Sequence, residues 1–263
     1  MDTESVLHST SPEGITTITL NRPERKNAVD EAMWRRLTAV LAETRNCPQT
    51  RVVVLQGAGG DFCTGADVAK SKHEEHPIPR LRRIGDVARA IHDLPVPVVA
   101  KVDGVAAGAG LNMALACDVV AASDRARFTE IFTKRGLSID FGGSWLLPKI
   151  VGMQQAKRLA LLAEVIDAAE AERIGLVTWV RPADELDAFV DETARRLAGL
   201  PPVALEQTKA LINSAVGVDL AGALRNEAAA QAVNFATEDA PAAFKAFLEK
   251  AESPQYTGRW ALR

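Results

Sequence analysis

Hydrophobic and polar positions along the first part of the chain predict a hairpin, a helix and a buried strand. Residues 6–8 lead through a Ser-Pro-Glu-Gly turn into residues 15–20, where β-branched residues predict a strand. Apolar residues three and four positions apart predict a helix that ends near residue 43, with Asp30 as its N-cap. The continuous apolar run at 51–55 is typical of a strand buried on both faces.

The middle of the chain continues this alternation of strands and helices. Polar residues at 70–79 predict a loop, and the pattern after them predicts a helix over 80–93. Apolar runs predict strands over 98–102 and 117–122, with a short helix over 111–116 between them. The first two-thirds of the chain therefore predict an α/β fold.

The last third of the chain is predicted to be almost wholly helical. From Gly142 onward, one apolar run at 176–180 interrupts the helical pattern and predicts a strand. The helices are expected at residues 153–163, 168–174, 183–198, 203–214, 218–234 and 238–250. Their Ala-rich apolar stripes require a cover, and we expect a neighbouring subunit of a homo-oligomer to supply it.

Composition narrows the class of protein. A chain of 263 residues can bury a large core without disulfides, and its three scattered cysteines indicate a reducing cytoplasm. No apolar run reaches about 18 residues, which excludes a membrane span, and the acidic N-terminus does not resemble a signal peptide. Lys and Arg number 31 against 34 Asp and Glu, a net charge of −3 that argues against nucleic acid as a partner. We expect a cytoplasmic enzyme.

Two glycine-rich segments, at 57–67 and 104–110, follow predicted strands. Neither has the spacing of a dinucleotide-binding fingerprint, and no Gly-Lys-Ser/Thr of a phosphate-binding loop occurs. Backbone N–H groups in such turns can converge on an anionic oxygen, and the helix that begins near Gly110 adds the positive end of its dipole. Tight turns alone would explain one such segment, whereas two of them favour an oxyanion-binding site.

Motifs over nearly the whole chain resemble those of the enoyl-CoA hydratase/isomerase (crotonase) superfamily. The motifs are residues 18–23 with 27–28, 61–67, 97–104 with 108–110, 117–118, 142–148 and 168–177. The resemblance implies an α/β crotonase (ClpP-like) spiral of ββα units with a C-terminal helical trimerisation region. Residues 1–195 would form the spiral core with the acyl-CoA site, and residues 196–263 the helical oligomerisation region of a homotrimer or dimer of trimers.

The same resemblance implies the ligand and the oxyanion hole. The substrate would be an acyl-CoA thioester, so that coenzyme A enters as part of the substrate and no separate cofactor or metal is required. The backbone N–H groups of Ala66 and Ala109 would hold the thioester carbonyl. A carbanion next to a thioester becomes accessible only when the charge that moves onto oxygen is stabilised, which such donors do.

Further residues, only some of them implied by the resemblance, are expected to bind the CoA thioester. Besides the two alanines they are Arg25, Lys26, Thr64, Asp67, Val68, Gly108, Phe132, Trp145, Lys250 and Tyr256. Arg25 and Lys26 would supply positive charge for the cofactor tail. Lys250 and Tyr256 match positions that reach a neighbouring subunit's CoA in relatives. Asp67 also has a structural interpretation, since a side chain at this place can bond nearby backbone.

The catalytic positions depart from those of the family's hydratases, which carry two glutamates. Asn112 and Phe132 stand at those positions here; an amide does not exchange a proton at neutral pH, and phenylalanine cannot hold a water molecule. Asp140 stands where isomerases of the family, including the epoxyphenylacetyl-CoA isomerase branch, place a single carboxylate. One carboxylate suffices for a 1,3-proton shift, so the pattern favours an acyl-CoA isomerase. The alternative role for Asp140 is to cap the helix after Gly142.

Two other functions stay open. Glu130 lies two residues before Phe132 and is the nearest other acid, so it is the reserve base of a hydratase or related acyl-CoA lyase. Loss of both family glutamates is also compatible with a non-catalytic protein that binds CoA thioesters. The sequence does not specify the acyl chain. An apolar pocket is predicted from Phe128, Phe132, Phe141, Trp145 and Leu146.

Overall fold

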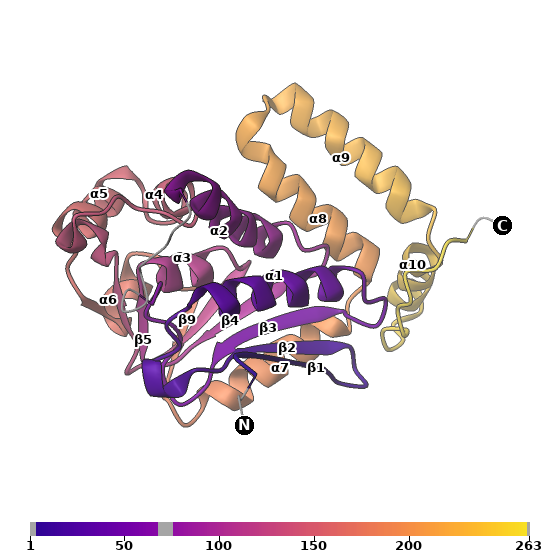
Figure 1. The fold of residues 1–263 in the computed structure, drawn as a ribbon. Coiled ribbons are helices and arrows are strands. Elements are labelled where there is room, and N and C mark those ends of the chain that lie inside the picture. Colours follow the sequence, from indigo (N-terminus) through magenta and orange to yellow (C-terminus); the bar gives the residue numbers. More distant parts are fainter. Residues whose placement is uncertain (1–3, 68–75, 262–263) are drawn as a thin grey trace.

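The computed structural model describes residues 4–67 and 76–261, and a six-stranded sheet forms its centre (Figure 1). In spatial order the strands are β1 (Val6–Thr10), β2 (Ile15–Leu20), β3 (Val52–Gly57), β4 (Val98–Val102), β6 (Val119–Ser123) and β9 (Trp179–Arg181). β1 and β2 form the predicted antiparallel hairpin, and every later pair is parallel. The predicted α/β class is correct.

The structure contains a second, three-stranded sheet that the sequence analysis did not predict. It consists of β5 (Val105–Ala107), β7 (Arg127–Thr129) and β8 (Ile166–Asp167). β5 pairs parallel with β7, and β7 pairs antiparallel with β8. β5 lies inside the segment that was interpreted as a glycine loop, and β8 lies in the region predicted to be helical. Strands of two or three residues carry too little periodicity to predict, because tertiary pairing forms them.

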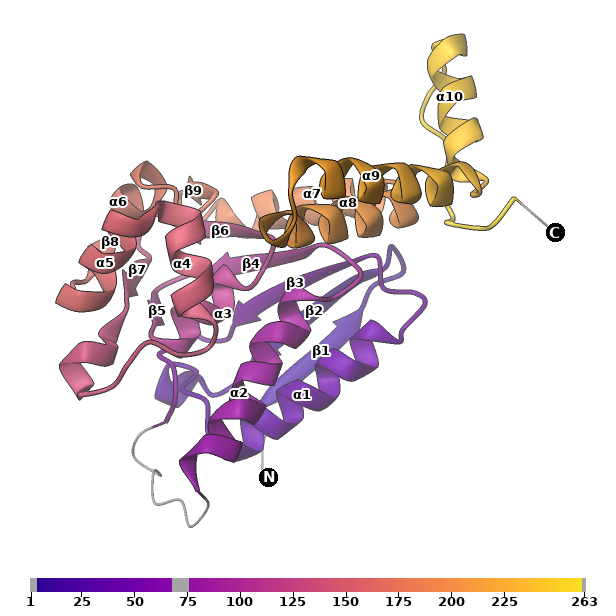
Figure 2. The same cartoon turned by 90° about the horizontal axis from the view of Figure 1, so that it is seen from above.

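Helices cover both faces of the large sheet. α1 (Glu31–Arg45), α2 (Pro77–His92) and α3 (Ala109–Leu115) contribute to one apolar core, and α7 (Leu186–Ala198) packs on the opposite face (Figures 1 and 2). α1 starts as predicted, since the Asp30 carboxylate accepts a hydrogen bond from the Met33 N–H. α2 begins three residues before the predicted residue 80, and residues 70–75 of the predicted loop lie outside the described residues.

The remaining helical segments are mostly those predicted. They are η1 (Pro23–Arg25), η3 (Ile131–Arg135), α4 (Gly143–Val151), α5 (Met153–Leu162), α6 (Ala168–Arg173), α8 (Pro202–Ser214), η4 (Ala215–Gly217), α9 (Leu220–Phe235) and α10 (Asp239–Glu249). The strand predicted over 176–180 is displaced to β9. The helix predicted over 111–116 starts earlier, at Ala109, and this shift places the amide of Ala109 at a helix N-terminus.

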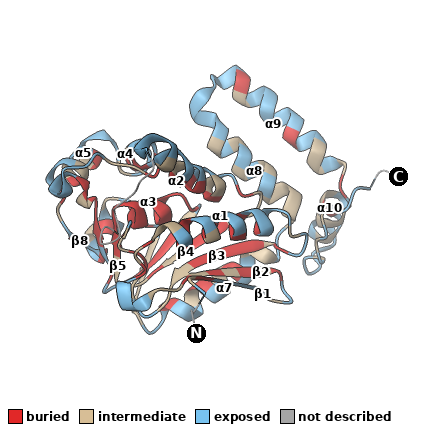
Figure 3. Cartoon of the chain, in the orientation of Figure 1, coloured by how far each residue is buried: buried red, intermediate tan, exposed pale blue. Residues whose placement is uncertain are grey.

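α9 and α10 extend away from the two sheets (Figure 2), whereas Lys209 ties α8 to the core through hydrogen bonds to Asp118 and to the Val96 carbonyl. Most residues of α9 and α10 are exposed in the single chain (Figure 3), including Phe247 at 80% and Leu248 at 79%. α7 crosses the predicted boundary at 195/196 and packs against the sheet, so the core extends to the end of that helix. Within residues 4–67 and 76–261, no helix has the length and hydropathy that a bilayer span requires.

Candidate active site

A cavity of about 500 Å³ opens beside the N-terminus of α3. Its walls are Arg25, Ala28, Thr64, Gly65, Ala66, Asp67, Ala107, Gly108, Ala109, Thr129, Ile131, Phe132, Arg135, Leu137 and Asp140. The fold therefore brings together both predicted oxyanion residues, the predicted base Asp140 and most of the predicted binding residues. A smaller pocket, lined by Val29, Trp34 and Arg80 among others, shares Ala66 and Asp67 with this cavity and adjoins it.

Two backbone amides lie at this cavity without an acceptor in the described backbone. Ala109 is the first residue of α3, and the first helical bond runs from the Asn112 N–H to the Gly108 carbonyl, so the Ala109 amide has no helical partner. Ala66 lies opposite Val29 in a parallel bridge in which Val29 bonds to the Gly65 carbonyl and the Asp67 amide. The Ala66 N–H consequently points away from Val29, towards the β5–α3 side.

Close backbone contacts explain the glycines of the two loops. A Cβ added to Gly110 would lie 2.2 Å from the Cys63 carbonyl oxygen. Gly65 has a φ of +88°, and a Cβ there would lie 2.9 Å from the Ala107 oxygen and 3.4 Å from the Ala109 nitrogen. The glycines thus allow the two amide-bearing segments to approach each other, in addition to forming turns.

Asn27 holds the first of these loops in place. Its side chain is fully buried, accepts from the Arg22 N–H at 2.9 Å, and donates to the carbonyls of Ala58 and Asp61 at 2.9 and 2.7 Å. Asp67 pairs with Arg22 Nη2 at 3.0 Å, so this cavity-lining carboxylate is bound to an arginine. The sequence analysis expected Asp67 to bond nearby backbone, whereas the structure pairs its carboxylate with the side chain of Arg22.

Asp140 lies in the segment between η3 and α4 and lines the cavity. Its Oδ1 is buried without a hydrogen-bond partner in the described residues, and burial raises the pKa of this carboxyl to about 6 against the opposing charge of Arg80. Phe141 has a φ of +52°, and its ring lies 5.5 Å from that of Trp34, which anchors the turn. Gly142 is the N-cap of α4, so the capping role considered for Asp140 is wrong.

Glu130 is completely buried and is not among the lining residues of the cavity. Burial raises its pKa to about 8; the Asn112 hydrogen bond opposes this shift and the charge of Asp140 adds to it. The Asn112 Nδ2 lies 3.4 Å from Glu130 Oε2 and 3.0 Å from the backbone oxygen of Asp140. The reserve base of the sequence analysis therefore lies behind Asp140, outside the lining of the cavity.

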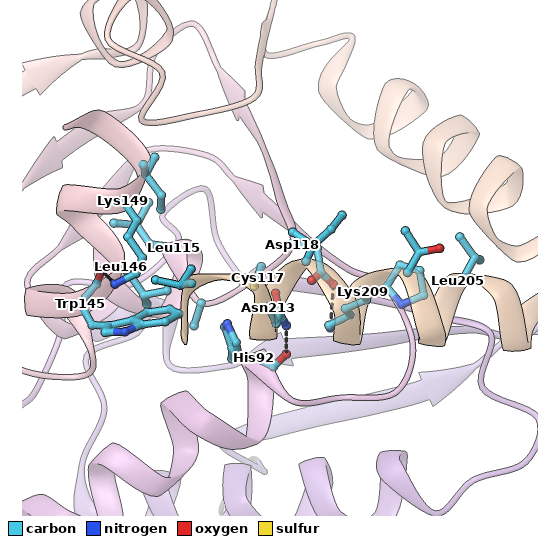
Figure 4. A pocket seen from close by; sticks show the side chains of 16 residues that line it. His92, Leu115, Cys117, Asp118, Trp145, Leu146, Lys149, Leu205, Lys209 and Asn213 are labelled. Atoms are coloured by element: carbon cyan, nitrogen blue, oxygen red, sulfur yellow. Dashed lines mark hydrogen bonds and ion pairs between the residues drawn. The ribbon is translucent and has the colours of Figure 1, made fainter. Parts of the chain in front are cut away.

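Several predicted binding residues do not reach this cavity within one chain. Trp145 lines another pocket of about 460 Å³ with His92 and Lys149, so its assignment to the acyl pocket is wrong for the single chain (Figure 4). The ammonium group of Lys26 pairs with Asp61 at 3.4 Å outside the lining. Lys250 is the C-cap of α10, and the Tyr256 carbonyl accepts a hydrogen bond from Arg51 Nη1 at 3.0 Å. Val68 lies outside the described residues.

Among the lining residues outside the family motifs and the glycine-rich segments, the sequence analysis missed Thr129, Ile131 and Arg135. They lie in or next to β7 and η3, which the pattern did not predict. Of the aromatic residues expected to form the apolar pocket, Phe132 lines the cavity, whereas Phe128 and Phe141 are core residues.

Comparison with known proteins assigns the family. The family model described as "Enoyl-CoA hydratase/isomerase" matches residues 10–259. A probable enoyl-CoA hydratase of Rhodobacter capsulatus is 39% identical over 94% of this chain and 96% of its own length. The 1,2-epoxyphenylacetyl-CoA isomerase of Escherichia coli K12 is 37% identical over 94% and 96%. A crystal structure of an enoyl-CoA hydratase from Bacillus anthracis superimposes with a TM-score of 0.92 at 31% identity, covering 97% of this chain and all of that one.

Fold, cavity and matches together define an enzyme of acyl-CoA thioesters with the crotonase architecture. The chain belongs to the enoyl-CoA hydratase/isomerase (crotonase) superfamily. The predicted spiral fold is confirmed by these structural matches. The matches do not single out the isomerase branch, because a hydratase and an isomerase are similar to this chain at nearly equal identity.

Proposed function

We propose that this protein is an acyl-CoA isomerase that converts a 3-enoyl-CoA, or a related ring-derived CoA thioester, to the 2-enoyl form. One observation carries the proposal. Asp140 lines the cavity that also contains the amides of Ala66 and Ala109, and its buried Oδ1 has no partner in the described residues. Asp67 is the other acidic residue among the lining residues, and Arg22 already binds its carboxylate.

The mechanism follows from this arrangement. The thioester oxygen accepts hydrogen bonds from the amides of Ala66 and Ala109, while ionised Asp140 removes a proton from C2. The electron pair of the broken C–H bond moves into the conjugated system, and the negative charge gathers on the oxygen as a dienolate. Asp140 then returns the proton to C4, which leaves the double bond between C2 and C3. One amide of such a hole stabilises the transition state by about 3 kcal/mol.

The walls of the cavity favour this reaction over hydration. Adding water to a double bond needs a group that positions and deprotonates a water molecule as well as a proton donor. Phe132 presents an aromatic ring at one wall, and the Glu130 carboxyl lies outside the lining.

The quaternary structure that we propose is a homotrimer or a dimer of trimers. Arg25 and Arg135 give the cavity mouth of one chain positive charge for the CoA phosphates, while Lys250 and Tyr256 would reach the CoA of a neighbouring chain. The exposed apolar side chains of Leu224, Phe244 and Phe247 require a cover. Light scattering is expected to give the mass of three or six chains, and a monomer at micromolar concentration would contradict the arrangement.

Incubation with two substrates separates the candidate reactions. The purified protein is incubated with 3-enoyl-CoA and with 2-enoyl-CoA in separate reactions. The products are separated, and their molecular masses are measured by mass spectrometry. The isomerase converts the first substrate to the second without a change in mass. Addition of one water to 2-enoyl-CoA would show a hydratase instead. Tight binding of both thioesters without turnover would identify a binding protein.

Activity is expected to fall at acidic pH because Asp140 must be ionised to accept a proton. Burial raises the pKa of Asp140 to about 6 from an ordinary value of 3.8. The rate kcat/KM should therefore be level above that pH and fall about tenfold for each pH unit below it. A pH–rate profile of the free enzyme measures this limb. A level rate down to about pH 4 would mean that Asp140 is not the base.

A further inference from the structure

Two buried polar side chains behind Asp140 have no part in the proposed proton shift. Asn112 on α3 and Glu130 after β7 each have 0% exposed surface, and neither lines the cavity. A buried amide or carboxyl group destabilises the fold unless it is hydrogen-bonded. The hydrogen bonds that these two side chains form therefore indicate their role.

Asn112 connects Glu130 to the segment that carries Asp140. Its Nδ2 donates to Glu130 Oε2 at 3.4 Å and to the backbone oxygen of Asp140 at 3.0 Å. The Gly143 backbone packs against this amide so closely that an added Cβ would lie 2.3 Å from Nδ2. Since the amide is enclosed, it fixes the backbone at Asp140 relative to Glu130.

Buried acceptors without a donor favour the protonated form of Glu130. In the described part of the chain, Asn112 Oδ1, Glu130 Oε1 and Asp140 Oδ1 are buried acceptors without a donor. An ionised Glu130 contributes acceptors alone, whereas a protonated carboxyl contributes one O–H donor. Burial and the negative charge of Asp140 raise the pKa of Glu130 to about 8, in the same direction.

We propose that Asn112 and a protonated Glu130 form a neutral positioning unit that fixes Asp140 and leaves the pair of carboxyl groups with one negative charge. That charge resides on Asp140, which faces the cavity. Among the described charged groups, the Asp140 carboxylate raises the pKa of Glu130, and the Arg80 guanidinium from α2 lowers the pKa of Asp140. The role of the unit rests on the proposed isomerase function, whereas the protonation of Glu130 does not.

Thermal unfolding of Glu130→Gln tests the protonation without any assay of activity. Folded Glu130 keeps its proton up to about pH 8, while unfolded Glu130 loses it near the ordinary value of 4.5. The folded wild type thus binds one more proton than the unfolded chain between these values, so its stability falls as pH rises. Glutamine is the isostere of the protonated acid and lacks this titration. The Tm of the variant, relative to wild type, is therefore expected to rise steadily between about pH 5 and pH 8.

The matched control is Glu192→Gln, an exposed glutamate on α7. Its Tm relative to wild type is expected to be independent of pH over the same range. A pH-independent Tm difference for Glu130→Gln as well would show that Glu130 is ionised in the folded protein. An ionised Glu130 would overturn the proposed positioning unit even if the protein were an isomerase. A Tm difference that rises with pH would support a protonated Glu130 even if no isomerase activity were found.

Kinetics then test the positioning role. The acid limb of the pH profile should keep its place in Glu130→Gln, because no charge is removed from beside Asp140. Loss of an ionised glutamate would instead move the limb down by about one pH unit or more. Asn112→Ala is expected to lower kcat about tenfold with KM within about twofold, since Asn112 does not line the cavity. A rise in KM at unchanged kcat, or a displaced acid limb, would overturn the role.

Discussion

Asp140→Asn is expected to lower kcat for 3-enoyl-CoA by about 10³-fold, within the range found for loss of a general base. The amide keeps the size of the side chain but cannot accept the C2 proton at neutral pH. Binding of the thioester should persist, because the amides of Ala66 and Ala109 and the walls of the cavity are unchanged. Steady-state kinetics and calorimetric titration with a 2-enoyl-CoA measure the two properties separately.

The control for this variant is Asp191→Asn, an exposed position on α7 away from the cavity. It should bind and turn over like the wild type. Rates of Asp140→Asn within about tenfold of wild type would assign the proton transfer to another group. Loss of both binding and turnover, with a lowered Tm, would mean instead that Asp140 is needed for the fold of the segment between η3 and α4.

Ala109→Pro is expected to lower kcat/KM by about 10²–10³-fold, the loss found when one oxyanion donor is removed. Ala109 is the first residue of α3, where proline is tolerated because its missing N–H has no helical partner. The substitution therefore removes the amide that faces the cavity. The neighbouring Gly65 leaves limited space, as a Cβ there would lie 3.4 Å from the Ala109 nitrogen, so the circular dichroism and Tm of the variant are measured with its kinetics.

Met153→Pro is the matched control for this variant. Met153 is the exposed first residue of α5, and it follows an N-cap glycine of positive φ just as Ala109 does. This control should keep the activity of the wild type. Should Ala109→Pro fold and retain a kcat/KM within about fivefold of wild type, the Ala109 amide would not be an oxyanion donor.

Long periodic segments made the fold largely predictable from the sequence. The buried face of α1 and its Asp30 cap, and the continuous apolar runs of β3 and β4, follow local rules that the structure obeys. The small sheet does not follow such rules. β5 and β7 have three residues each and exist because segments from distant parts of the chain pair with each other. Sequence periodicity carries no signal for such pairing.

Residues that belong to family motifs could be placed in the site from the sequence. Residues whose position depends on the direction of the side chain could not. The motifs placed Ala66, Ala109 and Asp140, and the structure brings all three to one cavity. Trp145 was placed in the same cavity, but the course of α4 directs it to another pocket. The burial of Glu130 depends on an irregular segment between β7 and η3, whose side-chain directions no periodicity fixes.

The central claim is that one carboxylate removes a proton from C2 and returns it to C4. It is tested most directly with 3-enoyl-CoA that carries deuterium at both C2 positions, converted in ordinary water in a single turnover with enzyme in excess. Transfer by Asp140 predicts 2-enoyl-CoA with one deuterium retained at C2 and a measurable fraction of the other at C4. Product with hydrogen alone at C4, or a hydroxyacyl-CoA heavier by one water, would contradict the account.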